Sequence, residues 1–504
     1  MTSSQRIIVN TIAQYTRTII NVCLSLYSTR LILSALGQSD YGIYSVVAGV
    51  VAMLSFVTNA LITTTQRYLS FHHGKKDFNQ VRLVFSNSWL LHIFLGILVV
   101  AILGVLGPWI TQDFLNIEDA RRSAALFVYL SAVAMLFLSF ITAPVRALFI
   151  ARENIVYTSV IDVLDGVLKL TIAIILSKIT YDHLIAYSSM LIAISGFNLL
   201  AFTIYASIKF PEFHLPRLRE LNKQYLKGLS NFAGWTIYSA GCVIARNQGI
   251  SVILNLFYGT VINAAYGIAQ QVMGAVQFIS TSILQAMNPQ IMKAEGAGKR
   301  ERMLRLCEYE SKYSFLLLSL VAIPLIAEME MILHLWLRHV PEYAVMFCRF
   351  ILVASLCDQI SVGLTSANQA IGQIRNYNII FYTLKLVIII IGWICLKLQL
   401  PISSIMWAYV IIELLTSLLR LPLMKWIANI NMKLFCKNVF ARILVPILII
   451  SCTCLIITHY CHNPYRLLIT ISTSILTGMI SIWFTSLSSE EKTYVYNLLK
   501  KCNV

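Results

Sequence analysis

Apolar runs of about 20 residues recur from one end of the chain to the other. A helix needs about that many mainly apolar residues to cross the hydrocarbon core of a bilayer. Only 12% of the 504 residues are charged, about half the share found in soluble domains. Because short loops join the runs and no stretch remains for a soluble domain, the sequence predicts an all-α integral membrane protein.

Charged residues between the apolar runs define about fourteen predicted transmembrane helices, with twelve as the alternative count. The predicted spans are 9–36, 41–66, 83–110, 123–145, 155–177, 184–208, 228–258, 261–287, 313–333, 343–371, 377–396, 402–424, 440–460 and 465–487. We expect an N-lobe over 1–215 with helices 1–6 and a C-lobe over 216–430 with helices 7–12. The segment 431–504 then adds helices 13–14 and a cytoplasmic tail.

Positive charge alternates between successive connections. The formal net charge is +17, and in membrane proteins such an excess collects in cytoplasmic loops. We therefore expect no nucleic-acid binding. The alternation predicts that both termini are cytoplasmic and that the number of spans is even. The basic residues assigned to cytoplasmic connections include Arg67, Lys75, Arg146, Arg152, Lys223, Lys293, Lys299, Arg375, Arg420, Lys425 and Lys437.

Short motifs recur at a nearly constant offset. Gln66 recurs as Gln290 at an offset of 224 (290 − 66), and Tyr41 of a Tyr-Gly-Ile motif recurs as Tyr266 at 225 (266 − 41). A period of six helices preserves the orientation of each helix in the membrane. The offsets therefore predict two parallel six-helix lobes, with two C-terminal helices outside the repeat.

Several charged residues lie inside the predicted spans. A charged side chain at the bilayer centre costs about 2.5–3.5 kcal/mol on insertion scales, so it normally faces a cavity or a partner. The cations are Arg17, Arg30, Lys169, Arg246, Arg349 and Lys385, and the acids are Asp162, Asp165, Asp358 and Glu413. We interpret the arginines and Lys385 as candidate substrate-binding residues in a cationic cavity, and the acids as candidate carriers of a coupling ion.

Polar residues at helical spacing form stripes on helices of both predicted lobes. Such stripes predict a hydrated cavity between the lobes. The candidate lining residues are Gln14, Asn21, Asn247, Gln248, Gln270 and Gln277, and the tenth helix adds Asp358, Ser361, Thr365 and Asn368.

Each charged residue also has a structural interpretation. Asp165 and Lys169 are four residues apart on one helix and can neutralise each other. Arg30 and Arg349 lie toward helix ends and can extend to the lipid headgroups. Glu413 and Lys385 can pair between adjacent helices. Arg17 and Arg246 lie deeper among polar neighbours, which favours contact with a solute.

No constellation of an enzyme is present in the sequence. There is no P-loop, the histidines are isolated, and no loop is long enough for a catalytic site. The eleven cysteines are scattered, and the spacing of Cys452 and Cys454 suits neither zinc nor a disulfide. We expect no enzymatic activity, no cofactor and no metal.

The stretch from Leu36 to Tyr44, Leu-Gly-Gln-Ser-Asp-Tyr-Gly-Ile-Tyr, resembles a signature of Wzx-type polysaccharide flippases. Gln66-Arg67-Tyr68 and the motif from Gly372 to Tyr377 are similar to this family as well. The family belongs to the superfamily that also holds the multidrug and toxin exporters and the lipid II flippases. The resemblance covers nearly the whole chain through its helix count and its two-lobe repeat.

The resemblance implies a bacterial inner-membrane flippase. Its cargo would be an undecaprenyl-diphosphate-linked oligosaccharide, turned to the periplasmic face for O-antigen, capsule or exopolysaccharide synthesis. Relatives use arginines in the first helix of each lobe, where Arg17 and Arg246 lie here. Implied partners are membrane lipids, H+ or Na+ as a coupling ion, and other polysaccharide assembly proteins. The alternatives are a cation-coupled multidrug exporter, a lipid II flippase, and a polytopic glycosyltransferase or polymerase.

Overall fold

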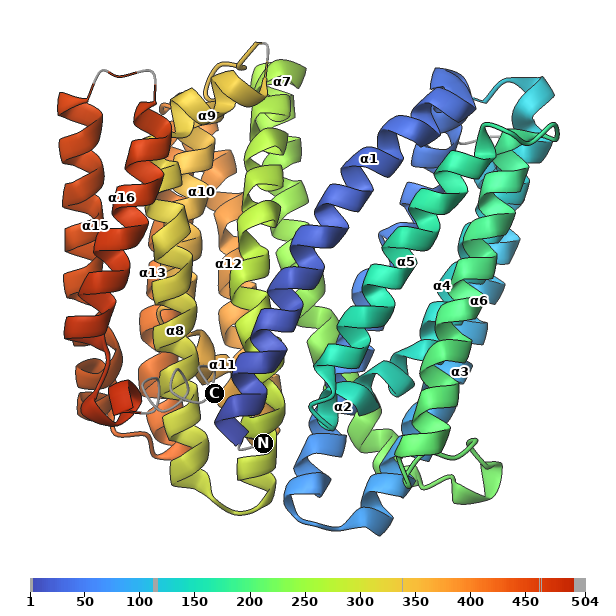
Figure 1. Cartoon of the computed structure of the whole chain (residues 1–504), viewed down its shortest axis with the longest axis horizontal. Helices are drawn as coiled ribbons and strands as arrows, with labels where there is room; N and C mark the ends of the chain where they lie inside the picture. The colour runs from blue at the N-terminus through green and yellow to red at the C-terminus, as the bar shows by residue number, and fades with distance from the viewer. Residues whose placement is uncertain (1–2, 112–116, 338, 462, 464, 494–504) are drawn as a thin grey trace, which may run out of the picture. The chain divides into compact units, whose positions relative to one another are not determined.

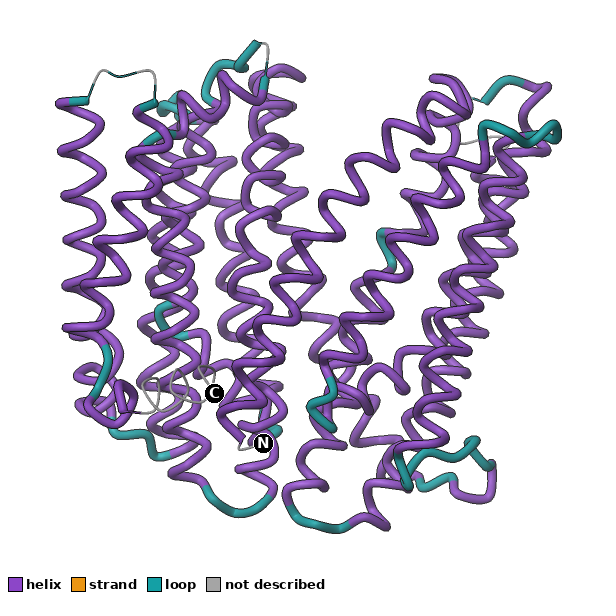
Figure 2. The backbone as a smooth tube through the Cα atoms, in the orientation of Figure 1, coloured by secondary structure: helices purple, strands orange, loops and turns teal. Residues whose placement is uncertain are grey.

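The structure is a computed structural model that describes residues 3–111, 117–337, 339–461, 463 and 465–493, all of which lie in helices, turns and loops (Figure 2). The predicted tail beyond residue 493 lies outside the described residues. The α-helices, all labelled in Figure 1 except α14, are α1 (Ser3–Ala52), α2 (Ser55–Gly74), α3 (Phe78–Trp109), α4 (Arg122–Ala151), α5 (Ile155–Leu176), α6 (His183–Lys209), α7 (Lys223–Gly296), α8 (Arg300–Ala327), α9 (Met329–Trp336), α10 (Ala344–Gln359), α11 (Val362–Ile371), α12 (Ile374–Lys397), α13 (Ser403–Ala428), α14 (Met432–Phe435), α15 (Ala441–Tyr460) and α16 (Arg466–Ser481).

Two glycines divide the longest helices. Gly37 in α1 has φ 77° and ψ 171°, and Gly259 in α7 has φ 78° and ψ −170°. Only glycine adopts this region without strain. The two kinks are 222 residues apart (259 − 37), close to the offsets of the sequence motifs. Each kink therefore separates two successive helices at equivalent places in the repeat.

The number of spans follows from these breaks. Among the described residues, ten helices are long and apolar enough to cross a membrane, or eleven if α10 and α11 form one bent span. The 74 residues of α7 would extend about 110 Å at 1.5 Å per residue, so α7 supplies two spans. The α5 helix, with 22 residues, is also long enough to cross a membrane, but its three charged residues, Asp162, Asp165 and Lys169, keep it out of the ten. The end of α1 together with α2 supplies a further span. The predicted all-helical membrane fold is confirmed.

Three predicted spans were wrong in detail. The span 41–66 is interrupted at Met53 and Leu54 and continues to Gly74, and the span 313–333 is interrupted at Glu328. The span 343–371 is two helices bent by 46°. Arg67, Arg146, Lys293 and Arg420, which were predicted in loops, lie inside α2, α4, α7 and α13. The charge rule ended α2, α4 and α7 too early because it treats a charge as exposed, whereas these side chains contact other protein groups.

The chain forms two compact units. Unit 1 comprises Met1–Ala240 and Met292–Lys299, and unit 2 comprises Gly241–Ile291 and Arg300–Val504. In unit 1 an apolar core joins α3, α4 and α6, where the buried hydroxyl of Tyr129 donates to the carbonyl of Leu103 at 3.0 Å. In unit 2, Leu320 and Ile323 of α8 pack with Ile450 and Cys454 of α15. Large apolar side chains such as Val105 (80% exposed) remain on the outside, as a lipid-facing surface requires.

Within unit 1, the end of α7 packs closely against the end of α2. A Cβ atom at Gly74 would lie 2.1 Å from the carbonyl oxygen of Lys293, and one at Gly296 would lie 2.0 Å from that of Phe71. Gly74 and Gly296 are 222 residues apart (296 − 74), the same separation as the two kinks. Any larger residue at either position would force the two helix ends apart.

Candidate functional site

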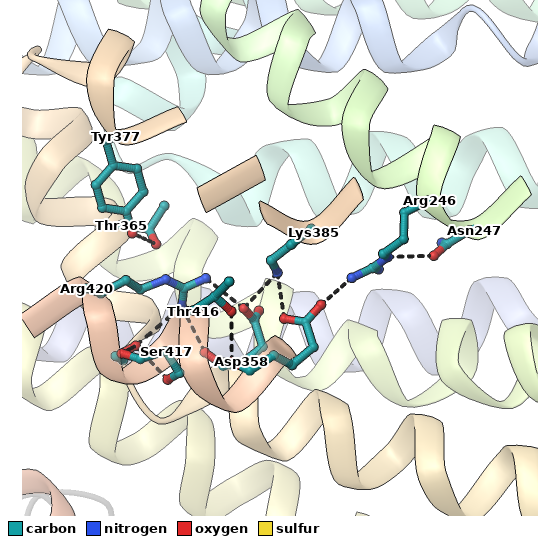
Figure 3. A network of polar contacts seen from close by, with 11 residues as sticks. Arg246, Asn247, Asp358, Thr365, Tyr377, Lys385, Thr416, Ser417 and Arg420 are labelled. Carbon is teal, nitrogen blue, oxygen red and sulfur yellow. Dashed lines mark hydrogen bonds and ion pairs between the residues drawn. The ribbon is translucent and has the colours of Figure 1, made fainter. Parts of the chain in front are cut away.

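Five charged side chains form a continuous chain of ion pairs in unit 2 (Figure 3). They come from α7, α10, α12 and α13, so residues far apart in the sequence meet in one place. Positive and negative groups alternate along the chain of ion pairs. In order, its members are Arg420, Asp358, Lys385, Glu413 and Arg246.

The distances show how tightly the chain of ion pairs is connected. Arg420 Nη2 donates to Asp358 Oδ1 at 2.7 Å, and Lys385 Nζ donates to the same oxygen at 3.1 Å. Lys385 Nζ lies 2.7 Å from Glu413 Oε2. Arg246 Nη1 donates to Glu413 Oε1, and Arg246 Nε donates to Asn247 Oδ1 at 3.1 Å. The guanidinium of Arg246 also lies 4.7 Å from the ring centre of Tyr409, within cation–π range.

Most of the chain of ion pairs is buried. The side chains of Arg246, Glu413, Lys385 and Arg420 are 10%, 5%, 7% and 4% exposed, whereas that of Asp358 is 27% exposed. Three cations face two acids, which leaves a surplus of one positive charge. Because buried charges are tolerated only when they are paired and hydrogen-bonded, each carboxylate here holds two cations in place.

Hydroxyl groups anchor the same region to the break between α10 and α11. Ser361 Oγ, at that break, lies 2.7 Å from Ser417 Oγ and donates to the carbonyl of Ser417 at 2.8 Å. Arg420 Nη1 donates to the carbonyl of Asp358 at 3.0 Å. These bonds fix the end of α10 against α13, so the network is sensitive to the position of the helix break.

Arg420 was missed as a member of the site and was predicted in a cytoplasmic loop. A signal for it exists in the sequence, because Tyr409, Glu413 and Arg420 follow the spacing of one helix face. The predicted alternative in which Glu413 pairs with Lys385 is present in the structure.

A second charged cluster lies in unit 1. Arg17 of α1 donates to Asp162 Oδ2 of α5 at 2.7 Å, and Arg146 of α4 donates to both oxygens of Asp162 at 3.0 Å. Here too the cations exceed the acids by one. Arg146 was predicted in a loop, but its guanidinium lies in this cluster and 5.3 Å from the ring centre of Phe202.

A cavity of about 480 Å³ opens beside the unit 1 cluster. It is an open, shallow depression rather than an enclosed pocket. The side chains of Arg17, Arg146 and Asp162 are 22%, 34% and 17% exposed, so both arginines remain accessible to solvent or to a ligand in spite of their pairing. The residues lining the cavity are Arg17, Thr18, Asn21, Val22, Ser25 and Asp162.

The predicted polar stripe on α1 thus borders this cavity in part. Asn21 Oδ1 is buried and accepts no hydrogen bond from the described residues, and a Cβ atom at Gly166 would lie 2.8 Å from it. Gln14, two turns earlier, is 1% exposed and its Nε2 likewise has no partner among them. The packing of α5 on α1 depends on Gly166, because a side chain there would displace Asn21.

Asp165 lies on α5 and takes part in a different set of contacts. It accepts a bond from Asn198 Nδ2 of α6 at 2.7 Å and pairs with Lys169 Nζ at 2.7 Å. The predicted structural pairing of Asp165 with Lys169 is therefore present.

The remaining candidates are spread over several elements. Arg349 donates to the carbonyl of Ile326 at 3.0 Å, and Arg30 is exposed. Gln270 Nε2 donates to the hydroxyl of Tyr266 at 2.7 Å, Gln248 is exposed and Gln277 is half-buried. None of these five joins either charged cluster among the contacts of the described residues.

One further charged group in unit 1 lies in the loop after α6. Glu212 is 4% exposed and accepts bonds from two nitrogens of Arg152, and His73 Nε2 lies 3.2 Å from it. Burial alone would raise the pKa of Glu212, but the bonds from His73 and Arg152 outweigh it and lower the pKa to about 2. This carboxylate ties the loop to α2 and to the turn after α4.

No family model matches the chain, and no curated protein matches it by sequence. Solved structures do match it. A MATE transporter in a bent conformation gives a TM-score of 0.74 at 13% identity, with 87% of this chain and 97% of that chain covered. A transporter of the MOP superfamily from Pyrococcus furiosus gives 0.73 at 12% identity, with 85% and 96% covered.

A third solved structure, the MATE transporter ClbM in complex with Rb+, gives a TM-score of 0.71 at 14% identity and covers 86% of this chain and 96% of its own. At these identities the likeness concerns the fold. The chain therefore has the fold of MATE transporters of the MOP superfamily.

Proposed function

We propose that the protein is a flippase for a lipid-linked oligosaccharide carried on a polyprenyl diphosphate, moving it from the cytoplasmic to the periplasmic leaflet of the bacterial inner membrane. The observation that carries the proposal is the cationic surplus at the open cavity of unit 1, where Arg17 and Arg146 share one carboxylate. An exposed guanidinium with a single shared acid can exchange that acid for a phosphate.

The chemistry of arginine supports a phosphate ligand. Its planar donors bind phosphate oxygens in pairs, and such charge-assisted bonds are roughly twice as strong as neutral ones. The glycan needs a polar route because each unpaired hydroxyl in hydrocarbon costs roughly 2–7 kcal/mol. Thr18, Asn21 and Ser25 beside Arg17 supply hydroxyl and amide groups that can replace water around a sugar.

The role of Arg246 in this proposal is conditional. Its guanidinium contacts Glu413, Asn247 and Tyr409, so it would bind a diphosphate only after releasing Glu413. We therefore propose the cavity at Arg17 as the primary anion site and the unit 2 network as a secondary one.

The second candidate is a multidrug exporter. The solved structures with this fold include MATE transporters, and one of them is described in complex with Rb+, which is compatible with cation coupling here. The Pyrococcus furiosus transporter is described as having a binding pocket of reversed polarity, which suggests a different function for that protein. A cationic substrate would be repelled by the surplus positive charge of the unit 1 cluster beside the cavity, so we favour the anionic lipid carrier.

The test is to delete the gene and analyse both lipid-linked saccharides and drug tolerance. We expect a polyprenyl-diphosphate glycan to accumulate on the cytoplasmic face, with export restored by the wild-type gene. Unchanged glycan levels together with increased sensitivity to cationic drugs would instead identify the exporter.

A further inference from the structure

Glu310 on α8 is a buried carboxyl group that belongs to neither charged cluster. Glu310 is 0% exposed, and neither of its carboxyl oxygens has a hydrogen-bond partner among the described residues. Ser314, one turn later on α8, is also 0% exposed, and its hydroxyl has no partner there either. An ionised carboxylate without a partner is far more costly to bury than a neutral acid. This packing is therefore compatible with the protonated form of Glu310.

The surface opposite Glu310 is supplied by α11. The hydroxyl of Ser366 interacts with the carboxyl group, although the distance and angle of a full hydrogen bond are not reached. A Cβ atom at Gly363 would lie 2.0 Å from the carbonyl oxygen of Cys307, and the Gly363 N–H donates to Ser311 Oγ at 3.0 Å. The two helices are thus in close contact on both sides of Glu310, which leaves no room for water while α11 stays in place.

The charged groups on the elements packed against α8 are engaged elsewhere. The α11 segment Val362–Ile371 contains no titratable residue. On α10, Asp358 pairs with Lys385 and Arg420, and Arg349 bonds the carbonyl of Ile326.

The remaining neighbours of α8 follow the same pattern. Arg442 of α15 contacts Ser486 and Glu491. Arg466 of α16 pairs with Glu328. Lys437, in the π-helical turn Cys436–Phe440, is exposed. Glu308 and Lys312 on α8 itself bond Asn438 and Glu491. Among the contacts of the described residues, none is an ion pair or hydrogen bond from a cation to Glu310.

Four other acids, which lie inside the predicted spans, contrast with Glu310. Asp162, Asp165, Asp358 and Glu413 each have at least one cation within ion-pair distance. Glu310 is the acid whose charge state depends on whether water reaches it.

We propose that Glu310 is the proton-binding site that couples transport to a proton gradient. When α11 moves away from α8, water reaches the carboxyl group, which gives its proton to a water molecule and becomes a carboxylate. When α11 returns, the carboxylate must first take a proton from hydronium, so an O–H bond forms on Glu310 as one breaks in the donor. The proposal rests on the transport function proposed above and adds a residue to it.

The break between α10 and α11 connects this site to the charged network. The two helices are bent by 46°, and Asp358 and Ser361 lie at the bend, where they contact Arg420 and Ser417. A movement of α11 that exposes Glu310 therefore shifts the groups that hold Asp358. In this way the protonation of Glu310 and the pairing of the network respond to the same helix.

Infrared spectroscopy of the purified protein in lipid vesicles near neutral pH tests the site directly. We expect an absorption band of a buried protonated carboxyl group in the wild type that disappears in Glu310→Gln. The matched control is Glu308→Gln, two residues earlier on the same helix, which should keep the band. If Glu310→Gln leaves the spectrum unchanged, the carboxyl group is ionised and the proposal is wrong.

Transport provides the second readout. Glutamine is nearly isosteric with the neutral acid, so Glu310→Gln should accumulate in the membrane normally, yet fail to export polysaccharide above the level of a deletion strain. Export at the wild-type level by Glu310→Gln would overturn the coupling role. If the deletion strain accumulates no lipid-linked saccharide, the flippase proposal fails, whereas the infrared result still decides the protonation of Glu310.

Discussion

The charged cluster of unit 1 and the chain of ion pairs in unit 2 have the same surplus of one positive charge but a different exposure. In unit 1, Arg17 and Arg146 are 22% and 34% exposed and share Asp162. In unit 2, Arg246, Lys385 and Arg420 are at most 10% exposed and share Asp358 and Glu413. An equal surplus of charge therefore belongs to an accessible cluster in one unit and to a largely buried one in the other.

The two clusters differ in how readily an anionic ligand can take the place of a paired carboxylate. Solvent weakens a partly exposed ion pair more than a buried one, so an anionic ligand can replace Asp162 at a lower cost than it could replace Glu413. Removing one partner of a buried pair costs about 3–5 kcal/mol, because the other charge is left without compensation. We infer that the unit 1 cluster is suited to binding, and that the unit 2 chain of ion pairs holds α7, α10, α12 and α13 together.

The largest effect is expected for Glu413→Gln, which removes the shared partner of Arg246 and Lys385. The loss of stability should be about 3–5 kcal/mol, seen as a lower melting temperature in detergent and a lower amount of protein in the membrane. Glu330→Gln, at an exposed position on α9, is the control and should change neither. Normal stability of Glu413→Gln with abolished export would mean that the unit 2 chain of ion pairs binds the substrate.

Replacing Arg17 tests the accessible cluster. Arg17→Ala should lose bonds worth about 1.5–3 kcal/mol, which corresponds to a roughly ten- to hundredfold loss of affinity, at an unchanged protein level. Lysine should restore export only in part, because it lacks the planar fork, and glutamate should be worse than alanine.

Export normalised to folded protein in a deletion strain measures the Arg17 series. The matched control is Arg122→Ala on α4, whose side chain is 45% exposed and pairs with Asp119. Full export by Arg17→Glu at normal abundance would contradict an anion site in this cavity.

A smaller effect on stability, which depends on pH, is expected when Glu212 of unit 1 is replaced. Glu212 is about as buried as the cations of the unit 2 chain of ion pairs. Its pKa in the folded protein is about 2 against an ordinary 4.5, so its stabilisation is fully present above pH 4.5 and is lost as the pH falls toward 2. Melting temperatures measured across this range should fall less steeply in Glu212→Gln than in the wild type. An identical slope would show that Arg152 and His73 do not hold the carboxylate.

The smallest effect is expected for Lys169→Met. The ammonium is 48% exposed and pairs with Asp165 four residues earlier, and such helical pairs contribute about 0.2–0.5 kcal/mol. The melting temperature should therefore stay close to that of the wild type, and so should export. A loss of export at normal stability would place Lys169 in the transport route and would contradict its structural interpretation.

The sequence by itself determined the fold class, because the length and spacing of apolar runs are imposed by the thickness of the bilayer. It also indicated the repeat, since motifs recur at offsets of 224 and 225, close to the 222 residues that separate the kinks at Gly37 and Gly259. The i,i+4 pair of Asp165 and Lys169 could be predicted because both partners lie on one helix.

Only the tertiary structure decided which charges are paired across helices. Asp162 meets Arg146, and Asp358 meets Arg420, although the sequence analysis placed both arginines in loops. Glu310 lies within one turn of the predicted cytoplasmic end of its span and gives no sign of burial in the sequence, yet it is completely buried beneath α11. The reason is physical: periodicity along a helix fixes the face on which a side chain lies, whereas the neighbour that this face meets depends on how separate helices pack.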